Sequence, residues 1–280
     1  MGDSLAAWLA LREPADVAAR SSALTSAVTG VLPRKSPLRV LDLGSGTGSN
    51  VRYLSARLPG AQEWLLVDRD PDLLSQVPGG TATCRIETLS RNLNTLDDAG
   101  IFSGRDLVTA SALLDLVSAR WLDTLAARCR ACGAAVLFAL TYNGESRCSP
   151  VEPEDDIIRD LMNRHQKRDK GLGGPAAGPD GVDCAERSFA AAGYQVRREA
   201  SDWILSAGHR ELQRQLIEGW AHAAAEQAPQ HAAMIQAWLA RRLAHVGAGT
   251  STITVGHEDL AAWKRGRESF FRTPKAAHLP

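Results

Sequence analysis

The sequence lacks the features that mark secreted and membrane-spanning proteins. It has only five cysteines among 280 residues, an odd number at irregular positions, which favours reduced thiols over a disulfide framework. No uninterrupted apolar run approaches the ~20 residues of a membrane span, and no stretch has the pattern of a signal peptide. We therefore expect a cytoplasmic protein without a membrane partner.

The sequence also lacks an excess of charge of either sign. Lysine plus arginine and aspartate plus glutamate each number 32, so no overall field attracts the chain to nucleic acid. A basic stretch at 264–275, with Phe270 and Phe271 in it, is interpreted as a frayed terminus rather than a nucleic-acid contact. Cys129 and Cys132 form a Cys-x-x-Cys pair without a second pair, so no metal site is expected.

The most informative stretch lies between residues 38 and 68. Residues 38–43 form an apolar run typical of a buried parallel strand, a glycine turn follows at 44–48, and 50–58 predicts a helix. A second apolar run at 64–67 ends on Asp68. Strand, glycine turn, helix, strand and acid form the nucleotide-binding half of a doubly wound sheet, in which the acid can accept hydrogen bonds from ribose hydroxyls.

The glycine turn lacks the endings that mark two other nucleotide sites. A dinucleotide fingerprint requires a glycine where this chain has Ser49, and the Gly-Lys-Ser/Thr ending of a P-loop is absent. The pattern is Asp-x-Gly-x-Gly-x-Gly, with Asp42 two residues before Gly44. A carboxylate at this place would repel a pyrophosphate, but not a ligand that carries an amino group and a sulfonium.

The segment from Asp42 to Gly48 resembles the first motif of the class I S-adenosylmethionine-dependent methyltransferases, and Asp68 resembles their ribose-binding acid. The resemblance implies S-adenosyl-L-methionine as the cofactor and S-adenosyl-L-homocysteine as the product. It also implies an α/β fold with a doubly wound, seven-stranded, mostly parallel Rossmann-like sheet. The cofactor-binding residues that it implies are Arg20, Asp42, Gly44, Ser45, Gly46, Asp68, Arg69, Asn92, Leu93 and Ser111.

Some of these positions have a second interpretation. The family usually has an acid where this chain has Asn92, whose amide can still accept a hydrogen bond from an adenine amino group. Asp16 and Arg20 could reach the amino and carboxylate ends of the cofactor, or could lie on an ordinary solvated helix face. Asp70 is expected to cap a helix that Pro71 begins.

The rest of the chain continues the alternation of strands and helices. We expect strands at 82–87, 106–110, 134–141 and 194–199, the last extending toward 205, and helices at 121–130 and 183–192. Residues 250–255 alternate and are expected to form a last strand, which the resemblance places antiparallel between the fifth and sixth strands. Residues 257–259 are expected to begin a helix. Residues 4–29 predict two short helices separated near Pro14.

We expect one domain over residues 1–280, with three additions to the sheet. Residues 1–36 would supply N-terminal helices over the cofactor. Residues 143–182 hold a helix at 153–168 and a loop rich in glycine and proline, which predicts a lid that meets substrate. Residues 206–249 hold two amphipathic helices, at 209–226 and 229–245, which predict a helical cap.

The candidate substrate-binding residues follow the strand ends or lie in the lid. Residues 111–115 follow the fourth strand, at the edge where open parallel sheets bind ligands. The candidate catalytic bases are His165, the only histidine of the polar lid cluster at 163–170, and Asp115; a solvated helix face and a helix cap are their respective alternatives. The predicted substrate-binding residues are Leu114, Asp115, Asn143, His165 and Trp203.

These residues predict methyl transfer from S-adenosylmethionine to a small molecule. A nucleic-acid methyltransferase, a nucleotide-binding protein without methyl transfer and a reductase that uses NADP through Arg69 are the alternatives. The chain has no Asn-Pro-Pro-Tyr after its fourth strand, which disfavours methylation of base amines. The methyl acceptor, its reacting atom and the oligomeric state remain open at this level.

Overall fold

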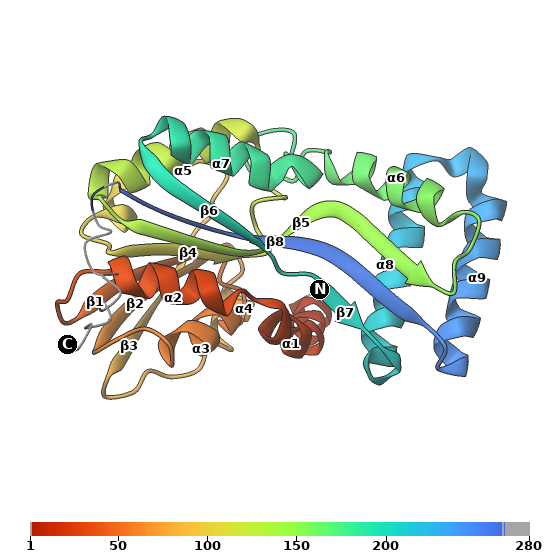
Figure 1. Ribbon diagram of the computed structural model, residues 1–280, viewed down its shortest axis with the longest axis horizontal. Helices are drawn as coiled ribbons and strands as arrows, with labels where there is room; N and C mark the ends of the chain where they lie inside the picture. Colours follow the sequence, from red (N-terminus) through yellow and green to blue (C-terminus); the bar gives the residue numbers. More distant parts are fainter. Residues whose placement is uncertain (1, 265, 267–280) are drawn as a thin grey trace, which may run out of the picture.

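The computed structural model describes residues 2–264 and 266 and has a mixed β-sheet at its centre (Figure 1). The strand order is β3-β2-β1-β4-β5-β8-β6, and β7 pairs with β8 next to β6. The strands are β1 (Leu38–Leu43), β2 (Gln62–Asp68), β3 (Cys84–Ser90), β4 (Leu107–Ser111), β5 (Ala135–Ser149), β6 (Tyr194–Ala200), β7 (Trp203–Leu205) and β8 (Thr252–Lys264). Because β6 and β7 share the position of the predicted sixth strand, the predicted seven-stranded, mostly parallel fold is confirmed.

Helices cover both faces of the sheet. The helices are α1 (Gly2–Ala19), α2 (Ser22–Val31), α3 (Ser49–Ser55), α4 (Pro71–Leu74), α5 (Ala119–Cys132), α6 (Asp155–Gln166), α7 (Gly181–Ala191), α8 (Arg210–Gln227) and α9 (Ala232–Ala248). Figure 1 shows α5 and α7 on one face and α2 and α3 on the other. Within the described residues, no helix combines the length and apolar character needed to cross a membrane.

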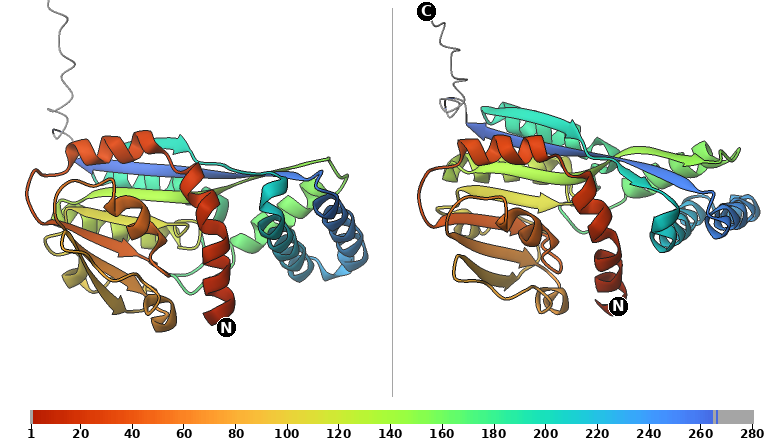
Figure 2. Two further views of the ribbon diagram at one scale, coloured as in Figure 1. Left: turned by 90° about the horizontal axis from the view of Figure 1, so that it is seen from below. Right: turned by 60° about the horizontal axis from the view of Figure 1, so that its bottom comes forward.

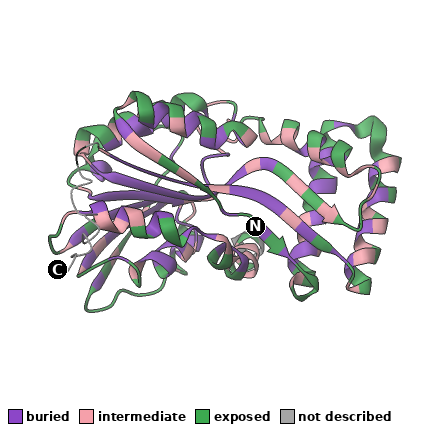
Figure 3. Ribbon diagram, viewed as in Figure 1, coloured by how far each residue is buried: buried purple, intermediate pink, exposed green. Residues whose placement is uncertain are grey.

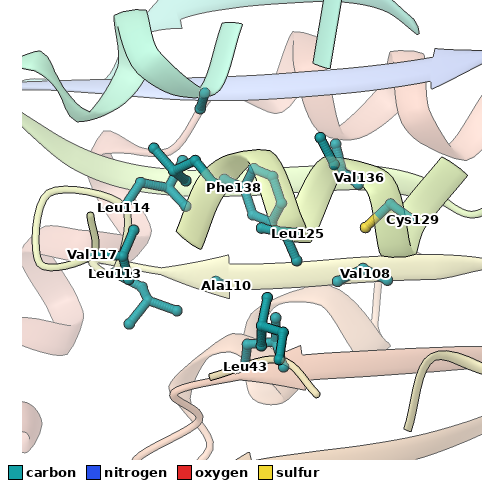
Figure 4. Close-up of a cluster of buried hydrophobic side chains, with 14 of the residues drawn as sticks. Leu43, Val108, Ala110, Leu113, Leu114, Val117, Leu125, Cys129, Val136 and Phe138 are labelled. Carbon is teal, nitrogen blue, oxygen red and sulfur yellow. The ribbon is translucent and has the colours of Figure 1, made fainter. Parts of the chain in front are cut away.

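The two faces of the sheet bury alternate residues of the same strands. Leu41 and Leu43 of β1 belong to the core beneath α5 and α7, whereas Val40 belongs to the core beneath α2 and α3. Side chains alternate across a strand with a period of two, so a strand buried on both faces is apolar almost throughout. Figure 4 shows Leu43, Val108 and Ala110 beneath Leu125 and Cys129 of α5. Figure 3 shows that the central strands are buried and that the outer faces of the helices are exposed.

The strands β5 and β8 are longer than their neighbours and extend beyond the sheet. Their outer halves pair with each other, and β7 pairs with this part of β8 (Figure 1). The helices α6, α8 and α9 pack against this extension, and a separate hydrophobic core lies between them, β7 and part of α1. We call this extension, with its three helices, the helical arm.

Two expectations about these strands are wrong. The fifth strand does not end at Thr141 but continues to Ser149, with irregular pairing between 138 and 146. Residues 257–259 do not begin a helix, because they lie within β8. The polar sequence His257-Glu258-Asp259 hid this strand, although Asp259 is buried and accepts hydrogen bonds from the backbone nitrogens of Ser21 (2.8 Å) and Leu140 (2.8 Å).

The N-terminal helices also break at a different place from the one expected. Pro14 lies inside α1, and the break comes at Arg20 and Ser21. The Ser21 hydroxyl accepts a hydrogen bond from the backbone nitrogen of Leu24 (3.0 Å) and caps α2. Figure 2 shows α2 running along the sheet and α1 turning away from it. The basic stretch predicted at 264–275 lies, except for Lys264 and Gly266, outside the described residues.

Candidate active site

A cavity of about 430 Å³ opens at the carboxyl ends of β1, β2 and β4. This is the edge at which open α/β sheets bind their ligands. Its lining comes from α1, the glycine turn, the ends of β2 and β4 and the loop after α6. The residues that line it include Leu5, Leu9, Arg12, Asp16, Gly44, Ser45, Gly46, Thr47, Ser49, Asn50, Asp68, Arg69, Asp70, Leu93, Ser111, Ala112, Leu113, Leu116, Lys170 and Leu172. We call it the first cavity.

The glycine turn has the backbone that its sequence requires. Gly44, Gly46 and Gly48 have φ values of 66°, 51° and 82°, in the left-handed region that favours glycine. A Cβ atom on Gly46 would lie 3.0 Å from Cδ1 of Leu9, so α1 packs directly over the turn. A side chain at this position would therefore push against α1, which also lines the first cavity.

Asp68 fixes the glycine turn and also faces the first cavity. One carboxylate oxygen accepts a hydrogen bond from the backbone nitrogen of Gly46 (2.8 Å), and the other accepts one from Asp70 (3.0 Å). Each carboxylate oxygen can accept a further hydrogen bond, so Asp68 keeps capacity for a ribose hydroxyl. Asp70 caps α4 through the backbone nitrogens of Asp72 (2.9 Å) and Leu73 (3.3 Å), as its position predicts.

A buried chain of polar side chains lies behind the turn. Arg20 donates to the amide oxygen of Asn50 (2.6 Å), and the Asn50 amide nitrogen donates to Asp42 (2.7 Å) and to the Thr109 hydroxyl (3.0 Å). The second carboxylate oxygen of Asp42 is buried without a hydrogen-bond partner. Burial raises the pKa of Asp42 to about 7, against the opposing effects of Asn50 and Arg20. Asn50 lines the first cavity, whereas Arg20 and Asp42 lie behind it.

A second cavity, of about 230 Å³, adjoins the first. The two cavities share Arg12, Ala112 and Leu116 in their linings. Aromatic and apolar side chains make up most of the second cavity, and Asp115, His257 and Gln166 add polar atoms to it. Its lining is Trp8, Arg12, Ala112, Asp115, Leu116, Leu140, Tyr142, Met162, Gln166, Leu216, Trp203, Trp220, Val255 and His257.

Asp115 and His257 are two buried ionisable groups that line the second cavity but not the first. Oδ1 of Asp115 has no hydrogen-bond partner, and burial raises the pKa of its carboxyl to about 6. Nδ1 of His257 lies 3.1 Å from the carbonyl oxygen of Val255, which requires the proton on Nδ1 and leaves Nε2 as an acceptor. Burial lowers the pKa of His257 to about 3, so its ring is neutral near neutral pH.

Arg12 lies between the cavities, with its charge already compensated. Its guanidinium donates to both carboxylate oxygens of Asp16, at 2.9 and 3.1 Å, and lies 5.0 Å from the ring centre of Trp203. The indole nitrogen of Trp203 donates to the same Asp16 carboxylate (3.0 Å). These contacts connect α1 to β7 and keep Arg12 in place.

Backbone strain marks the boundary between the sheet and the second cavity. Ala112 and Leu140 have φ values of 52° and 57°, which residues with a Cβ rarely adopt. Ala112 donates a backbone hydrogen bond to Ala139 (2.9 Å), and Leu140 donates to the buried carboxylate of Asp259 (2.8 Å). Such strain persists only where surrounding contacts hold it, and it is concentrated at functional sites.

The loop that follows α6 is attached to the segment after β4 by backbone hydrogen bonds. Ser118 donates to Leu172 (3.1 Å), Ala177 to Val117 (2.7 Å) and Gly178 to Asp115 (3.0 Å). These bonds hold Lys170 and Leu172 at the rim of the first cavity.

The structure separates the predicted site residues into groups. Gly44, Ser45, Gly46, Asp68, Arg69, Leu93 and Ser111 line the first cavity, and Asp115 and Trp203 line the second. The remaining cofactor candidate, Asn92, is exposed and accepts a hydrogen bond from the backbone nitrogen of Asn94 (2.9 Å).

Three predicted substrate residues lie away from these two cavities. Leu114 is buried in the core beneath α5 and α7. Asn143 lies at a separate hollow beside Arg198 and Glu258. His165 pairs with Glu226 of α8 (3.1 Å) and lines neither of the two cavities nor the hollow at Asn143.

Sequence reasoning missed Trp8, Arg12, Tyr142 and His257. Trp8 and Arg12 are four residues apart, a spacing that places both on one face of a helix. That spacing was a usable signal for an α1 face directed at the site. No local pattern pointed to Tyr142 or His257, which reach the second cavity only because β5 and β8 extend past the sheet.

No family model matches the chain, and no curated protein matches its sequence. Its structure is similar to a "putative type II methyltransferase" from Anaeromyxobacter dehalogenans, with 18% identity, a TM-score of 0.51 and coverage of 88% of this chain and 96% of that one. It is also similar to the cyclopropane synthase MmaA2 from Mycobacterium tuberculosis, with 14% identity, a TM-score of 0.45 and coverage of 85% and 82%.

A third similarity is to phosphoethanolamine N-methyltransferase 2 from Haemonchus contortus in complex with S-adenosyl-L-methionine. The identity is 14%, the TM-score is 0.47, and the match covers 94% of this chain but only 57% of that one. This chain therefore spans little more than half the length of the Haemonchus protein. The strand order and the Anaeromyxobacter comparison show that the chain has the fold of the class I S-adenosylmethionine-dependent methyltransferases.

Proposed function

We propose that this protein transfers a methyl group from S-adenosylmethionine to a small-molecule acceptor. The observation that carries the proposal is the adjacency of two unlike cavities, one with a glycine turn and a strand-end acid, the other mostly aromatic. The first suits a nucleoside, and the second suits a small organic molecule. Their shared lining of Arg12, Ala112 and Leu116 is the place where a donor and an acceptor would meet.

The residues of the first cavity fit the chemical groups of this cofactor. Asp68 would hold the ribose hydroxyls, and the glycine turn, which lines the first cavity, would lie against the ligand. The unpartnered oxygen of Asp42 lies behind the turn and favours a cationic ligand over a pyrophosphate. Leu93 offers an apolar contact for a base.

S-adenosylmethionine supplies a methyl group that its sulfonium has already activated. The main task of the protein is therefore orientation, which lowers a barrier by ~7–11 kcal/mol in the best intramolecular cases. Ala112 and Leu116 line both cavities and would exclude water from the place where the methyl group passes, and a backbone hydrogen bond to Ala139 holds Ala112 there. Asp115 can take a proton from the acceptor, a role that contributes typically ~10²–10⁴-fold.

Isothermal titration with S-adenosylhomocysteine tests the proposal. We expect binding by the wild-type protein and a loss of about 1.5–3 kcal/mol in Asp68→Ala, because a hydrogen bond to a charged acceptor is lost. Asp72→Ala, an exposed change on the next helix, is the matched control and should bind like wild type.

The same titration separates the alternatives. NADPH should not compete with S-adenosylhomocysteine, although Arg69 lines the first cavity. Tighter binding of NADPH than of S-adenosylhomocysteine, or equal affinity of wild type and Asp68→Ala with both folded by circular dichroism, would refute the proposed function.

A further inference from the structure

We propose that the second cavity binds its acceptor as a primary or secondary amine, through Asp115, and that the nitrogen of this amine receives the methyl group. This inference rests on the proposed function and adds the class of the acceptor. Three independent properties of the cavity support it: the charge of its lining, its hydrogen-bonding capacity and its aromatic content.

The charge of the lining opposes an anionic acceptor. Arg12 is the one cation among the residues that line this cavity, and both oxygens of Asp16 already pair with it. The Asp115 carboxylate is buried, with 7% of its residue surface exposed, and its Oδ1 has no partner. A carboxylate or phosphate acceptor would find no unpaired cation in this lining, whereas an ammonium would give Oδ1 of Asp115 the hydrogen-bond partner that it lacks.

The polar atoms of the cavity favour a ligand that donates hydrogen bonds. Oδ1 of Asp115 and Nε2 of His257 both accept, since Nδ1 of His257 is held by the Val255 carbonyl. Tyr142 also lines the cavity, but its hydroxyl donates to Asn163 (2.8 Å). A primary or secondary ammonium has at least two N–H donors for these acceptors, whereas a hydroxyl has one.

Aromatic side chains surround these acceptors. Trp8, Trp203, Trp220 and Tyr142 line the same cavity. Aromatic faces attract cations, and the attraction grows when the site is desolvated. At about 230 Å³ the cavity is smaller than the ~300–1,000 Å³ typical of drug-sized ligands, which favours a small amine.

The reaction that follows is balanced without a further reactant. The ammonium gives one proton to the Asp115 carboxylate, which makes the nitrogen lone pair available. That lone pair forms a bond to the methyl carbon, and the carbon–sulfur bond breaks with its electron pair passing to sulfur. The products are an N-methylammonium, a thioether and a protonated Asp115, which returns its proton to solvent.

Three probes of similar shape test the charge preference. With S-adenosylhomocysteine bound at saturation, calorimetry compares phenethylamine, 2-phenylethanol and phenylacetate. We expect phenethylamine to bind at least tenfold more tightly than 2-phenylethanol, and phenylacetate to bind most weakly. Equal or tighter binding of the alcohol or the acid overturns the inference. Because S-adenosylhomocysteine binding is measured first, its failure would refute the proposed function separately.

The variant Asp115→Asn tests whether Asp115 binds the amine. It should lower phenethylamine affinity at least tenfold and change 2-phenylethanol affinity less than twofold. Asp156→Asn, the same chemical change at an exposed position of α6, should alter neither. Unchanged phenethylamine affinity in a folded Asp115→Asn overturns the inference.

A titration of the wild-type protein avoids any folding defect in the variant. The titratable groups that line this cavity are Arg12 from α1, Asp115 after β4, Tyr142 from β5 and His257 from β8; Lys170 also acts on Asp115 through its charge. Among the lining groups, only Asp115 changes charge between pH 7.5 and pH 5, because burial places its pKa near 6 and that of His257 near 3. Phenethylamine should therefore bind severalfold more weakly at pH 5, and a pH-independent affinity overturns the inference.

Discussion

The carboxylate of Asp42 is hydrogen-bonded through one oxygen only, and its environment therefore disfavours its charged form. Burial raises its pKa to about 7 from an ordinary value of 3.8. An acid whose pKa is raised by folding holds its proton more tightly in the folded state. Its contribution to stability is present below pH 4 and is lost as the pH rises through about 7.

Asp42→Asn removes this pH dependence, because an amide does not titrate in this range. We expect the variant to gain stability relative to wild type as the pH rises: its free energy of unfolding minus that of wild type should be about 1–3 kcal/mol larger at pH 8 than at pH 5. Urea unfolding followed by circular dichroism at the two pH values measures this difference. Asp72→Asn is the matched control, and an equal effect of Asp42→Asn at both pH values would contradict the assignment.

The two candidate bases differ in what surrounds them. His165 is bonded to Glu226 and connects α6 to α8, whereas Asp115 lines the second cavity. Once a substrate is in hand, Asp115→Asn should lower kcat at least tenfold, while His165→Asn should change it less than twofold. Single-turnover rates measured by mass spectrometry distinguish the two. A tenfold loss in His165→Asn alone would return the role of base to the histidine of α6.

The site residues that could be predicted from the sequence are those that form one local pattern. The glycine turn and Asp68 are close in sequence and act together through a hydrogen bond of 2.8 Å from Gly46 to Asp68. Arg12 and His257 are far apart in the chain and meet only across the second cavity. Their positions depend on the packing of α1 and on the length of β8, which no short motif encodes.

At the level of elements, α1 forms one side of both cavities and packs against the glycine turn. Gly46→Val should lower S-adenosylhomocysteine affinity at least tenfold, because the new side chain would overlap Leu9 and displace α1, which lines the first cavity. Gly60→Val is a matched control: Gly60 has a comparable φ of 68°, but nothing lies within 4 Å of its Cβ position. Equal losses of affinity in both variants would show that backbone strain, rather than a filled site, is responsible.

The loop after α6 was expected to act as a glycine-rich lid. Among the described residues, its backbone hydrogen bonds fix one part of the loop and leave another part without such bonds. The amides of Ala177 and Gly178 are bonded to the segment after β4, whereas no such bond holds the amides of Gly173 and Gly174 in the described structure. Hydrogen exchange should therefore be slow at 177–178 and fast at 173–174. S-adenosylhomocysteine should slow exchange at 173–174, because Leu172 lines the first cavity. Uniform exchange over the loop would contradict this division.

At the level of the whole molecule, the helical arm contains a buried ion pair. The Arg242 guanidinium of α9 has no exposed side-chain surface and pairs with Asp155 at the start of α6, which also accepts from the indole of Trp238 (2.8 Å). Breaking such a pair from one side typically costs about 3–5 kcal/mol, because the other charge stays buried and unpaired.

Arg242→Met should therefore lower the free energy of unfolding by about that amount. The double variant Arg242→Met with Asp155→Leu should recover part of the loss, since no unpaired charge remains. Thermal unfolding of the single and double variants measures both effects. An additive loss in the double variant would mean that the pair is not what stabilises the arm.

The overall strand order was predictable because apolar runs and glycine turns alternate along most of the chain. The full extent of the arm was not predictable in the same way. The outer part of β8 alternates and was expected as a strand at 250–255, but the polar residues of β5 after Thr141 and of β8 at 257–259 hide how far the two strands continue. The two amphipathic helices at 210–227 and 232–248 could be recognised, but what they pack against could not.

The position of β8 has a consequence for how the protein is made. This strand lies between β5 and β6, yet it is the last strand of the described chain, and its Asp259 holds both Ser21 and Leu140. During translation, β1 to β5 can pair as soon as they emerge, whereas β6 and β7 must wait for β8 as their partner. The glycine turn can therefore form early, while the second cavity can form only after nearly all of the described residues have left the ribosome.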